Sequence, residues 1–223
     1  CRSKIKTPEE KDIKVFFIPG EGEQEKGVTE NIKTAADYML EGDGPFPGIK
    51  SASKIWIGCH RFFYNKMING LSNRMKSKQK PEIKIVADDD TFYKADDENC
   101  IDCGGSMPVE YTHMKSLADQ GALLKFMETN GAERQLHHSK YLIFANKNKK
   151  FTALFTGSAN LTGAGFKTNW ENSYYITIPE VVQKFADHYQ YTWDKLATAL
   201  EDLPAKPNVN DLLEDRPLIQ QNQ

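Results

Sequence analysis

The chain has 223 residues, of which 39% are hydrophobic, and a formal net charge of −2. It is long enough to bury a core, and it lacks the overall basicity of a protein that binds nucleic acid over its whole surface. No apolar run approaches the roughly 20 residues needed to cross a bilayer, so we expect a folded globular body whose affinity for any polyanion would come from a local patch.

The N-terminal residues are polar and begin with a cysteine, Cys1. A chain that starts at cysteine is what remains when a bacterial lipoprotein signal is cut before its lipidated residue. One expectation is therefore a lipoprotein of the periplasm or cell envelope, anchored through Cys1 with residues 1–12 as a tether. The alternative is an arbitrary chain boundary, which is also compatible with a cytoplasmic protein.

Apolar runs alternate with helical patterns along the first half of the chain. Residues 14–19, 54–58 and 82–87 are short apolar runs, bounded by turn residues, that are typical of buried strands. Apolar residues recur at helical spacing within residues 28–39 and 67–75. This alternation predicts an α/β sheet with helices packed on the outside.

Residues 93–112 form the least regular stretch and contain the pair Cys100 and Cys103. The Cys-x-x-Cys spacing leaves three interpretations open: a small disulfide loop, half of a zinc site, or two free thiols. No second cysteine pair or suitably spaced histidine pair follows to complete a zinc site. A short helix over residues 114–120 and a short strand over 123–127 are predicted next.

The last third of the domain contains the strongest strand patterns. Residues 139–146 and 151–156 are predicted strands joined by the short connection 147–150, and residues 172–178 form another. Pro179 is suited to the first turn of the longest predicted helix, because a missing N–H is harmless there. We see no internal repeat, so we expect a single copy of any functional site.

These elements together predict one α/β domain over residues 13–203, with a mixed central sheet flanked by helices. The polar residues 204–223 are predicted to form a trailing C-terminal arm.

The most informative residues lie on or near the two strands that are predicted to pair. His138 and Lys140 are two positions apart, so on a strand they point to the same face. Ser158 and Asn160 share this spacing, provided that the second strand continues as far as these residues. A hairpin through residues 147–150 would then bring the two pairs side by side.

This combination of side chains suits a phosphodiester. Lys140 and Asn160 can hydrogen-bond the non-bridging oxygens, and Ser158 can add another donor. A neutral His138 can attack phosphorus and form a covalent phosphohistidine, which water then hydrolyses. Glu171 is the candidate for holding the other ring nitrogen of His138, which would fix its tautomer and orientation.

The same residues resemble the signature of the phospholipase D superfamily: His-x-Lys, a later Gly-Ser-x-Asn, and a Glu-Asn pair. Here the three parts are His138-Ser-Lys140, Gly157-Ser-Ala-Asn160 and Glu171-Asn172. The spacing from Asn160 to Glu171 is similar to that of small bacterial nucleases in the superfamily. The resemblance covers roughly residues 13–200. It implies a phospholipase D-like fold and a phosphodiesterase that needs neither metal nor cofactor, in which Gly157 would also let phosphate approach the backbone.

The resemblance also implies a partner. In this superfamily two His-x-Lys motifs form one active centre, where one histidine attacks and the other protonates the leaving oxygen. This chain has one such motif, so we expect a homodimer with His138 and Lys140 at its two-fold interface. Because compact single-motif members of the superfamily are nucleases, we expect nucleic acid as the substrate and endonuclease activity.

Three alternatives remain open. Ala145 stands where the family pattern has an aspartate that supports the site by hydrogen bonding, so a weakly active module that binds phosphate or nucleic acid is one alternative. A lipid hydrolase of the phospholipase D type is the second. The third is a metal-dependent nuclease built on Asp88, Asp89 and Asp90, although such a run is more often a solvated loop or a helix cap.

Residues close to the motif in the sequence suggest two weaker hypotheses. Lys147, Lys149 and Lys150 crowd the predicted hairpin tip, where they are either solvated or steer phosphate toward the active centre. His60 follows the second predicted strand and is a minor candidate for lining the same cleft. His137 is expected to face away from His138 in a structural role.

Overall fold

The computed structural model describes residues 12–18, 33–89, 91, 109–128 and 136–203, and every structural statement below concerns these residues. The predicted tether, except Asp12, and the predicted C-terminal arm lie outside them, so the domain boundaries and lipid attachment stay predictions. So do the disulfide and zinc hypotheses, because they concern Cys100 and Cys103, which also lie outside.

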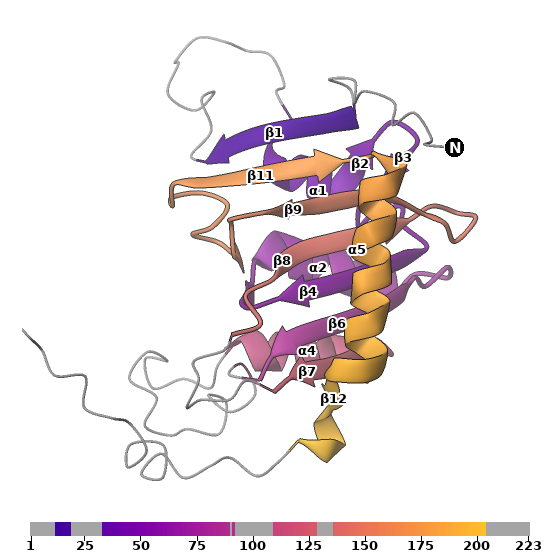
Figure 1. The fold of residues 1–223 in the computed structure, drawn as a ribbon, viewed down its shortest axis with the longest axis vertical. Coiled ribbons are helices and arrows are strands. Elements are labelled where there is room, and N and C mark those ends of the chain that lie inside the picture. The colour runs from indigo at the N-terminus through magenta and orange to yellow at the C-terminus, as the bar shows by residue number, and fades with distance from the viewer. Residues whose placement is uncertain (1–11, 19–32, 90, 92–108, 129–135, 204–223) are drawn as a thin grey trace, which may run out of the picture.

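Eight strands form one mixed sheet, in the order β1-β11-β9-β8-β4-β6-β7-β12 (Figure 1). Strands β4, β6 and β7 are parallel to one another, and every other neighbouring pair is antiparallel. The strands are β1 (Ile13–Ile18), β4 (Lys54–Cys59), β6 (Glu82–Asp88), β7 (Leu123–Met127), β8 (Lys140–Ala145), β9 (Phe151–Gly157), β11 (Glu171–Ile176) and β12 (Thr198–Ala199). Two small sheets pair β2 (Gly42–Asp43) with β3 (Phe46–Pro47) and β5 (Phe62–Phe63) with β10 (Leu161–Thr162).

Helices cover both faces of the large sheet, as Figure 1 shows. Three of them lie on one face: α1 (Ala35–Glu41), α2 (Asn65–Met75) and α4 (Val109–Asp119). The other face is crossed by α5 (Pro179–Tyr191), which continues into a π-helical turn over Thr192–Leu196 and later a 3-10 turn over Leu200–Asp202. The predicted mixed sheet between helices is therefore confirmed. None of the described helices is long and apolar enough to span a bilayer.

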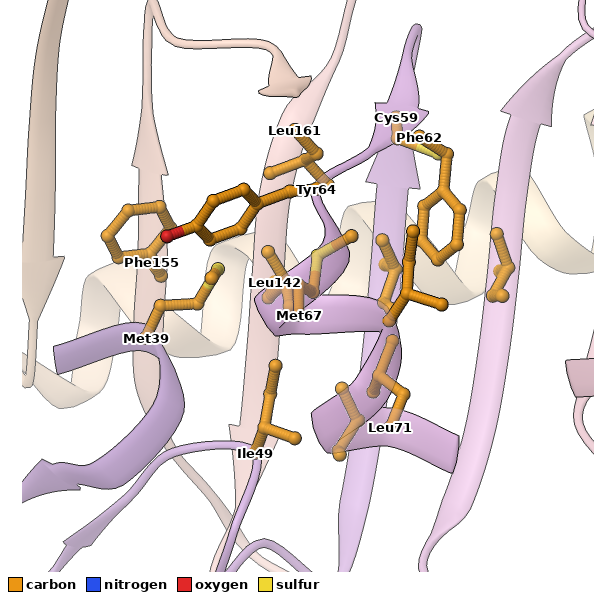
Figure 2. Close-up of a cluster of buried hydrophobic side chains, with 14 of the residues drawn as sticks. Met39, Ile49, Cys59, Phe62, Tyr64, Met67, Leu71, Leu142, Phe155 and Leu161 are labelled. Atoms are coloured by element: carbon orange, nitrogen blue, oxygen red, sulfur yellow. The ribbon is translucent and has the colours of Figure 1, made fainter. Parts of the chain in front are cut away.

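The core divides into two clusters because strand residues alternate between the two faces. The larger cluster packs α1 and α2 onto the sheet, and Figure 2 shows Met39, Met67 and Leu71 beside Leu142 and Phe155. The smaller cluster lies under α5 and contains Trp56, Tyr141 and Tyr189. Burial on both faces explains why β4 and β8 appear in the sequence as unbroken apolar runs.

The helix boundaries differ from the predicted ones. Helix α1 starts at Ala35 because Thr34 and Asp37 form a reciprocal capping box, although apolar residues at helical spacing begin at residue 28. Helix α4 starts at Val109, so the predicted loop 93–112 is wrong for its last four residues. The longest predicted helix does begin at Pro179, where the absent N–H costs nothing.

The strand directions define two ends of the sheet. At the end that we call the motif end, β8 and β11 begin while β4, β6 and β9 finish. At the opposite end, which we call the hairpin end, β4, β6 and β9 begin and the turn 146–150 connects β8 to β9. Cys59 pairs with Lys140 and Ser173 pairs with Gly157, so the predicted site residues gather at the motif end.

Candidate active site

His138 lies in the extended segment that leads into β8. The backbone of this segment is held from two sides: His60 N–H donates to the carbonyl of Ser139 at 3.0 Å, and His137 N–H donates to Oδ2 of Asp88 at 2.6 Å. The His138 side chain is exposed. Two neighbouring strand ends, those of β4 and β6, therefore fix the backbone of the candidate nucleophile while its imidazole stays accessible.

Lys140 is the first residue of β8, and its side chain turns back toward His138. It is only 8% exposed, and its Nζ donates to the backbone carbonyl of His138 at 3.0 Å. Burial lowers the pKa of Lys140, and the nearby carboxylate of Glu171 offsets part of that effect. An ammonium group has three N–H donors, so Lys140 keeps donors for a phosphate oxygen beside His138.

His60 contributes a second imidazole at the same place. Its ring centroid lies 5.0 Å from that of His138, with the ring planes inclined by 55°. The sequence marked His60 only by its position directly after a strand. The antiparallel pairing of β4 with β8 brings it to the motif.

Ser158 and Glu171 form a direct pair. Ser158 Oγ donates to Oε2 of Glu171 and accepts the backbone N–H of Asn172 at 3.0 Å, while Ser158 N–H donates to the Asn172 carbonyl at 2.9 Å. The first residues of β11 therefore position Ser158. Glu171 contacts Ser158 in this structure, so its predicted role in orienting His138 stays a prediction.

Gly157 is the last residue of β9, one residue beyond the predicted strand. A Cβ atom on Gly157 would lie 2.2 Å from the carbonyl oxygen of Asn172, since the backbones of β9 and β11 approach each other closely there. Strand β9 ends at Gly157, so the condition under which strand alternation would align Ser158 with Asn160 is not met. The close backbone contact is itself a reason for glycine, and phosphate binding by Gly157 stays a prediction.

Asn160 lies in the turn that follows. Its backbone carbonyl accepts Thr162 N–H at 2.7 Å, and a Cβ on Gly165 would lie 2.3 Å from that same oxygen. Phe166 stacks on Tyr64 at 4.4 Å and fastens this turn to the segment before α2. The buried Oδ1 of Asn160 has no hydrogen-bond partner among the described residues, so the fold does not use this atom.

Asp88 has a role that the sequence did not reveal, because it binds the backbone of His137. Asp88 is fully buried, and its carboxylate fixes the backbone at His137. Burial lowers the pKa of His137 to about 4, helped by the nearby histidines, so the ring is neutral near pH 7. In the stretches that the structure describes, no three His, Cys, Asp or Glu side chains cluster as a metal site, and Asp90 lies outside them.

Ala145 and the hairpin lysines lie at the hairpin end. Five strand steps of ~3.3 Å separate Ala145 from Lys140 along β8, about 17 Å in all. Lys147, Lys149 and Lys150 lie farther along, on the turn that joins β8 to β9. The hypothesis that these lysines flank the motif is therefore wrong, because a full strand length separates them from His138.

Comparison with known proteins identifies the family to which this fold belongs. A family model described as "Cardiolipin synthase, PLD-like domain" matches residues 48–193, more than half of the chain. No curated protein gives a significant match.

Solved structures share the fold at low identity. Nuc from Salmonella typhimurium, described as a phospholipase D family member, has a TM-score of 0.56 and 22% identity, over 84% of this chain and 96% of that chain. NucT from Helicobacter pylori has a TM-score of 0.55 and 15% identity, over 84% and 98% of the two chains. Phosphatidylserine synthase from Haemophilus influenzae Rd KW20 also has a TM-score of 0.55, at 13% identity, over 93% of this chain and 42% of that one.

Proposed function

Because this chain belongs to the family of phospholipase D-like domains, we propose that it hydrolyses phosphodiesters through a covalent intermediate on His138, without a metal ion. The observation that carries the proposal is the convergence of an accessible imidazole, a buried ammonium and the Ser158–Glu171 pair at the motif end. These groups supply a nucleophile and donors for a phosphate, which is what in-line displacement at phosphorus requires.

In the proposed reaction, neutral His138 attacks phosphorus, and an N–P bond forms as the bond to the leaving oxygen breaks. Lys140 and Asn160 donate to the non-bridging oxygens, where charge accumulates in the transition state. The equivalent histidine of a second copy protonates the leaving oxygen, then takes a proton from the water that attacks the phosphohistidine. The products are an alcohol and a phosphomonoester, and both histidines return to their starting states.

Glu171 is proposed to keep His138 in its reactive tautomer. Its negative charge lies close enough to raise the pKa of Lys140, which supports a place within the same electrostatic site. Ser158 already holds the carboxylate, so the hydroxyl fixes the residue that in turn orients the histidine. Glu171 is thus a positioning residue in this scheme.

A homodimer follows from the single motif, and the exposed side chains near that motif support it. Three large apolar residues near the site are exposed: Trp170 is 88% exposed beside Glu171, Phe17 is 62% exposed beside Ile18, and Leu136 is 50% exposed. Ile18 pairs with Glu171, so the first two lie at the start of β11. Exposed apolar area around a half-site is suited to burial against a second copy.

We propose that the substrate is nucleic acid, because compact single-motif members of the superfamily are nucleases. Cleavage would occur at internal phosphodiesters of the nucleic-acid strand. A phospholipid is the second candidate, since the same exposed apolar residues near the motif would also suit acyl chains. The weakly active binding module is the least supported, because Ala145 lies about 17 Å along β8 from Lys140. An alanine at position 145 therefore leaves the proposed phosphate donors Lys140, Ser158 and Asn160 in place.

The test is hydrolysis of bis(p-nitrophenyl) phosphate in excess chelator by the parent, His138→Asn and, as a control outside the motif, Lys195→Gln at an exposed position after α5. We expect the first variant to lose at least about a thousandfold in rate, because it lacks the nucleophile, and the control to keep the parent rate. Equal rates for the parent and His138→Asn would refute the mechanism.

A panel of single-stranded DNA, duplex DNA, RNA and phosphatidylcholine then identifies the substrate. The mass of the protein in solution tests the dimer.

A further inference from the structure

Six exposed lysines gather at the hairpin end of the sheet, although the net charge of the chain is only −2. Three lie on the turn between β8 and β9, and three on the loop between α2 and β6. Figure 1 shows both connections projecting from the same side of the sheet. We call them the lysine patch: Lys76, Lys78, Lys80, Lys147, Lys149 and Lys150.

One serine joins the two loops of the patch. Ser53 N–H donates to the carbonyl of Ala145 at 2.9 Å, and its hydroxyl donates to the carbonyl of Asn146, at the start of the turn. The Ser53 carbonyl accepts Glu82 N–H at 3.0 Å, where the second loop enters β6. Lysines about 70 positions apart in the sequence are thereby brought to one place.

Hydrogen bonds also define the backbone of each loop. Asn146 Oδ1 accepts the N–H groups of Asn148 and Lys150 at 3.0 and 3.2 Å, and Lys149 has a φ of 62°. Ser77 Oγ bonds the carbonyls of Arg74 and Gln79 at 2.8 and 3.1 Å. The backbone beneath the lysines is ordered, so a ligand would meet a largely formed surface.

The positive charges of the patch are not neutralised within the described residues. Glu82, where the second loop enters β6, pairs with Lys54 at 3.4 Å and not with a lysine of the patch. No ion pair to any of the six patch lysines occurs in the described part of the chain. The patch is therefore a local source of positive potential on an otherwise slightly acidic protein.

We propose that the lysine patch binds the phosphate backbone of nucleic acid, as an auxiliary contact for long substrates of the proposed nuclease. None of the large apolar side chains that the described structure exposes lies on these two loops. A surface of lysines alone lacks the apolar anchors of membrane-docking elements, but it suits counterion-releasing contacts with a polyanion. This inference rests on nucleic acid being the substrate.

The position of the patch predicts a dependence on substrate length. The patch is at least a strand length, about 17 Å, from Lys140. A dinucleotide with a single phosphodiester reaches only the active site, whereas a single strand of about 30 nucleotides is long enough to reach both places. The lysines should then affect the affinity for long strands and leave short substrates unaffected.

The experiment measures binding in the His138→Asn background, where cleavage does not interfere. Two paired variants, K147Q/K150Q and K78Q/K80Q, are compared with K184Q/K195Q, a matched pair of exposed lysines outside the patch. For a single strand of about 30 nucleotides, we expect each patch pair to weaken affinity at least tenfold at about 50 mM salt. The slope of log affinity against log salt should fall by about 1.4, and K184Q/K195Q should change neither quantity.

Three outcomes would overturn the inference: unchanged affinity in both patch pairs, an equal loss in K184Q/K195Q, or a patch-dependent affinity for anionic phosphatidylglycerol vesicles without any for DNA. Hydrolysis of bis(p-nitrophenyl) phosphate by the same pairs in the active background separates the two proposals, because it depends on the motif end alone. A parent that hydrolyses this compound but binds no DNA would overturn the patch and leave the phosphodiesterase intact.

Discussion

The two ends of the central sheet share the same strands and differ in how they hold positive charge. At the motif end, Lys140 is buried, bonded to a backbone carbonyl and close to Glu171. At the hairpin end, lysines such as Lys147 are exposed and unpaired within the described residues. A desolvated and oriented charge stabilises a transition state far better than a solvated one. Burial and orientation distinguish the end suited to catalysis from the end suited to attraction.

Neutralising one lysine at each end tests this difference most directly. We expect Lys140→Met to lower kcat on bis(p-nitrophenyl) phosphate by about a hundredfold to a thousandfold, as loss of one transition-state donor does. The exposed Lys147→Met should leave kcat within about twofold. Steady-state kinetics at saturating substrate measures both, and equal losses would show that the proposed division between the two ends is wrong.

A second difference between the ends is their response to acid. His137 is neutral when folded, with a pKa near 4, whereas an unfolded histidine has a pKa near 6.5. Between these values the unfolded chain binds more protons, so stability falls as the pH drops from about 6.5 to 4 and is regained as it rises. The contribution amounts to at most about 3 kcal/mol.

Denaturant unfolding at several pH values measures this effect. His137→Gln should flatten the acid side of the stability profile, because glutamine does not titrate. The same replacement of Lys147, which stays charged throughout this range, should leave the slope as it is in the parent. A parent profile that is already flat between these pH values would contradict the assignment.

At the motif end, the backbones of β9 and β11 approach each other closely at Gly157. Gly157→Ala places a Cβ against the backbone of Asn172 and should cost about 2 kcal/mol of unfolding free energy, since the strands must separate. Gly163→Ala is the matched control, because a Cβ there meets no heavy atom within 4 Å. Urea denaturation of the two variants checks the difference, and equal stabilities would show that β9 and β11 tolerate the methyl group.

The smallest expected effect concerns the unusual residue at the hairpin end. Ala145→Asp restores the family's aspartate at a fully buried position next to Ser53. Because that position is about a strand length from Lys140, we expect kcat to change by less than about threefold even if the fold loses stability. A tenfold gain in kcat would mean that the aspartate acts on the motif through the strand.

The sequence predicted the sheet well because burial on both faces leaves unbroken apolar runs, as in β4 and β8. It proposed His138, Lys140, Ser158 and Glu171 as site residues, and the structure brings these residues to one end of the sheet. It placed Lys147, Lys149 and Lys150 correctly at a hairpin tip, but it did not show that the six residues of β8 separate this tip from the motif.

What the sequence did not show were contacts created by strand order. Asp88 reaches the backbone of His137 only because β6 and β4 end beside the segment that starts β8. The Ser158–Glu171 bond likewise depends on the close approach of backbones at Gly157. No local pattern encodes either contact, because the partners meet only after the sheet has formed.

The position of β8 in the strand order has a consequence for how the protein opens. Strand β8 lies between β9 and β4 in the interior of the sheet, while β1 and the two-residue β12 are its edges. Edge strands open in local fluctuations, whereas an interior strand is released only when most of the sheet comes apart. Amide hydrogens next to Lys140 should therefore exchange with solvent at the rate set by global unfolding, so the proposed centre would persist through partial openings that detach either edge.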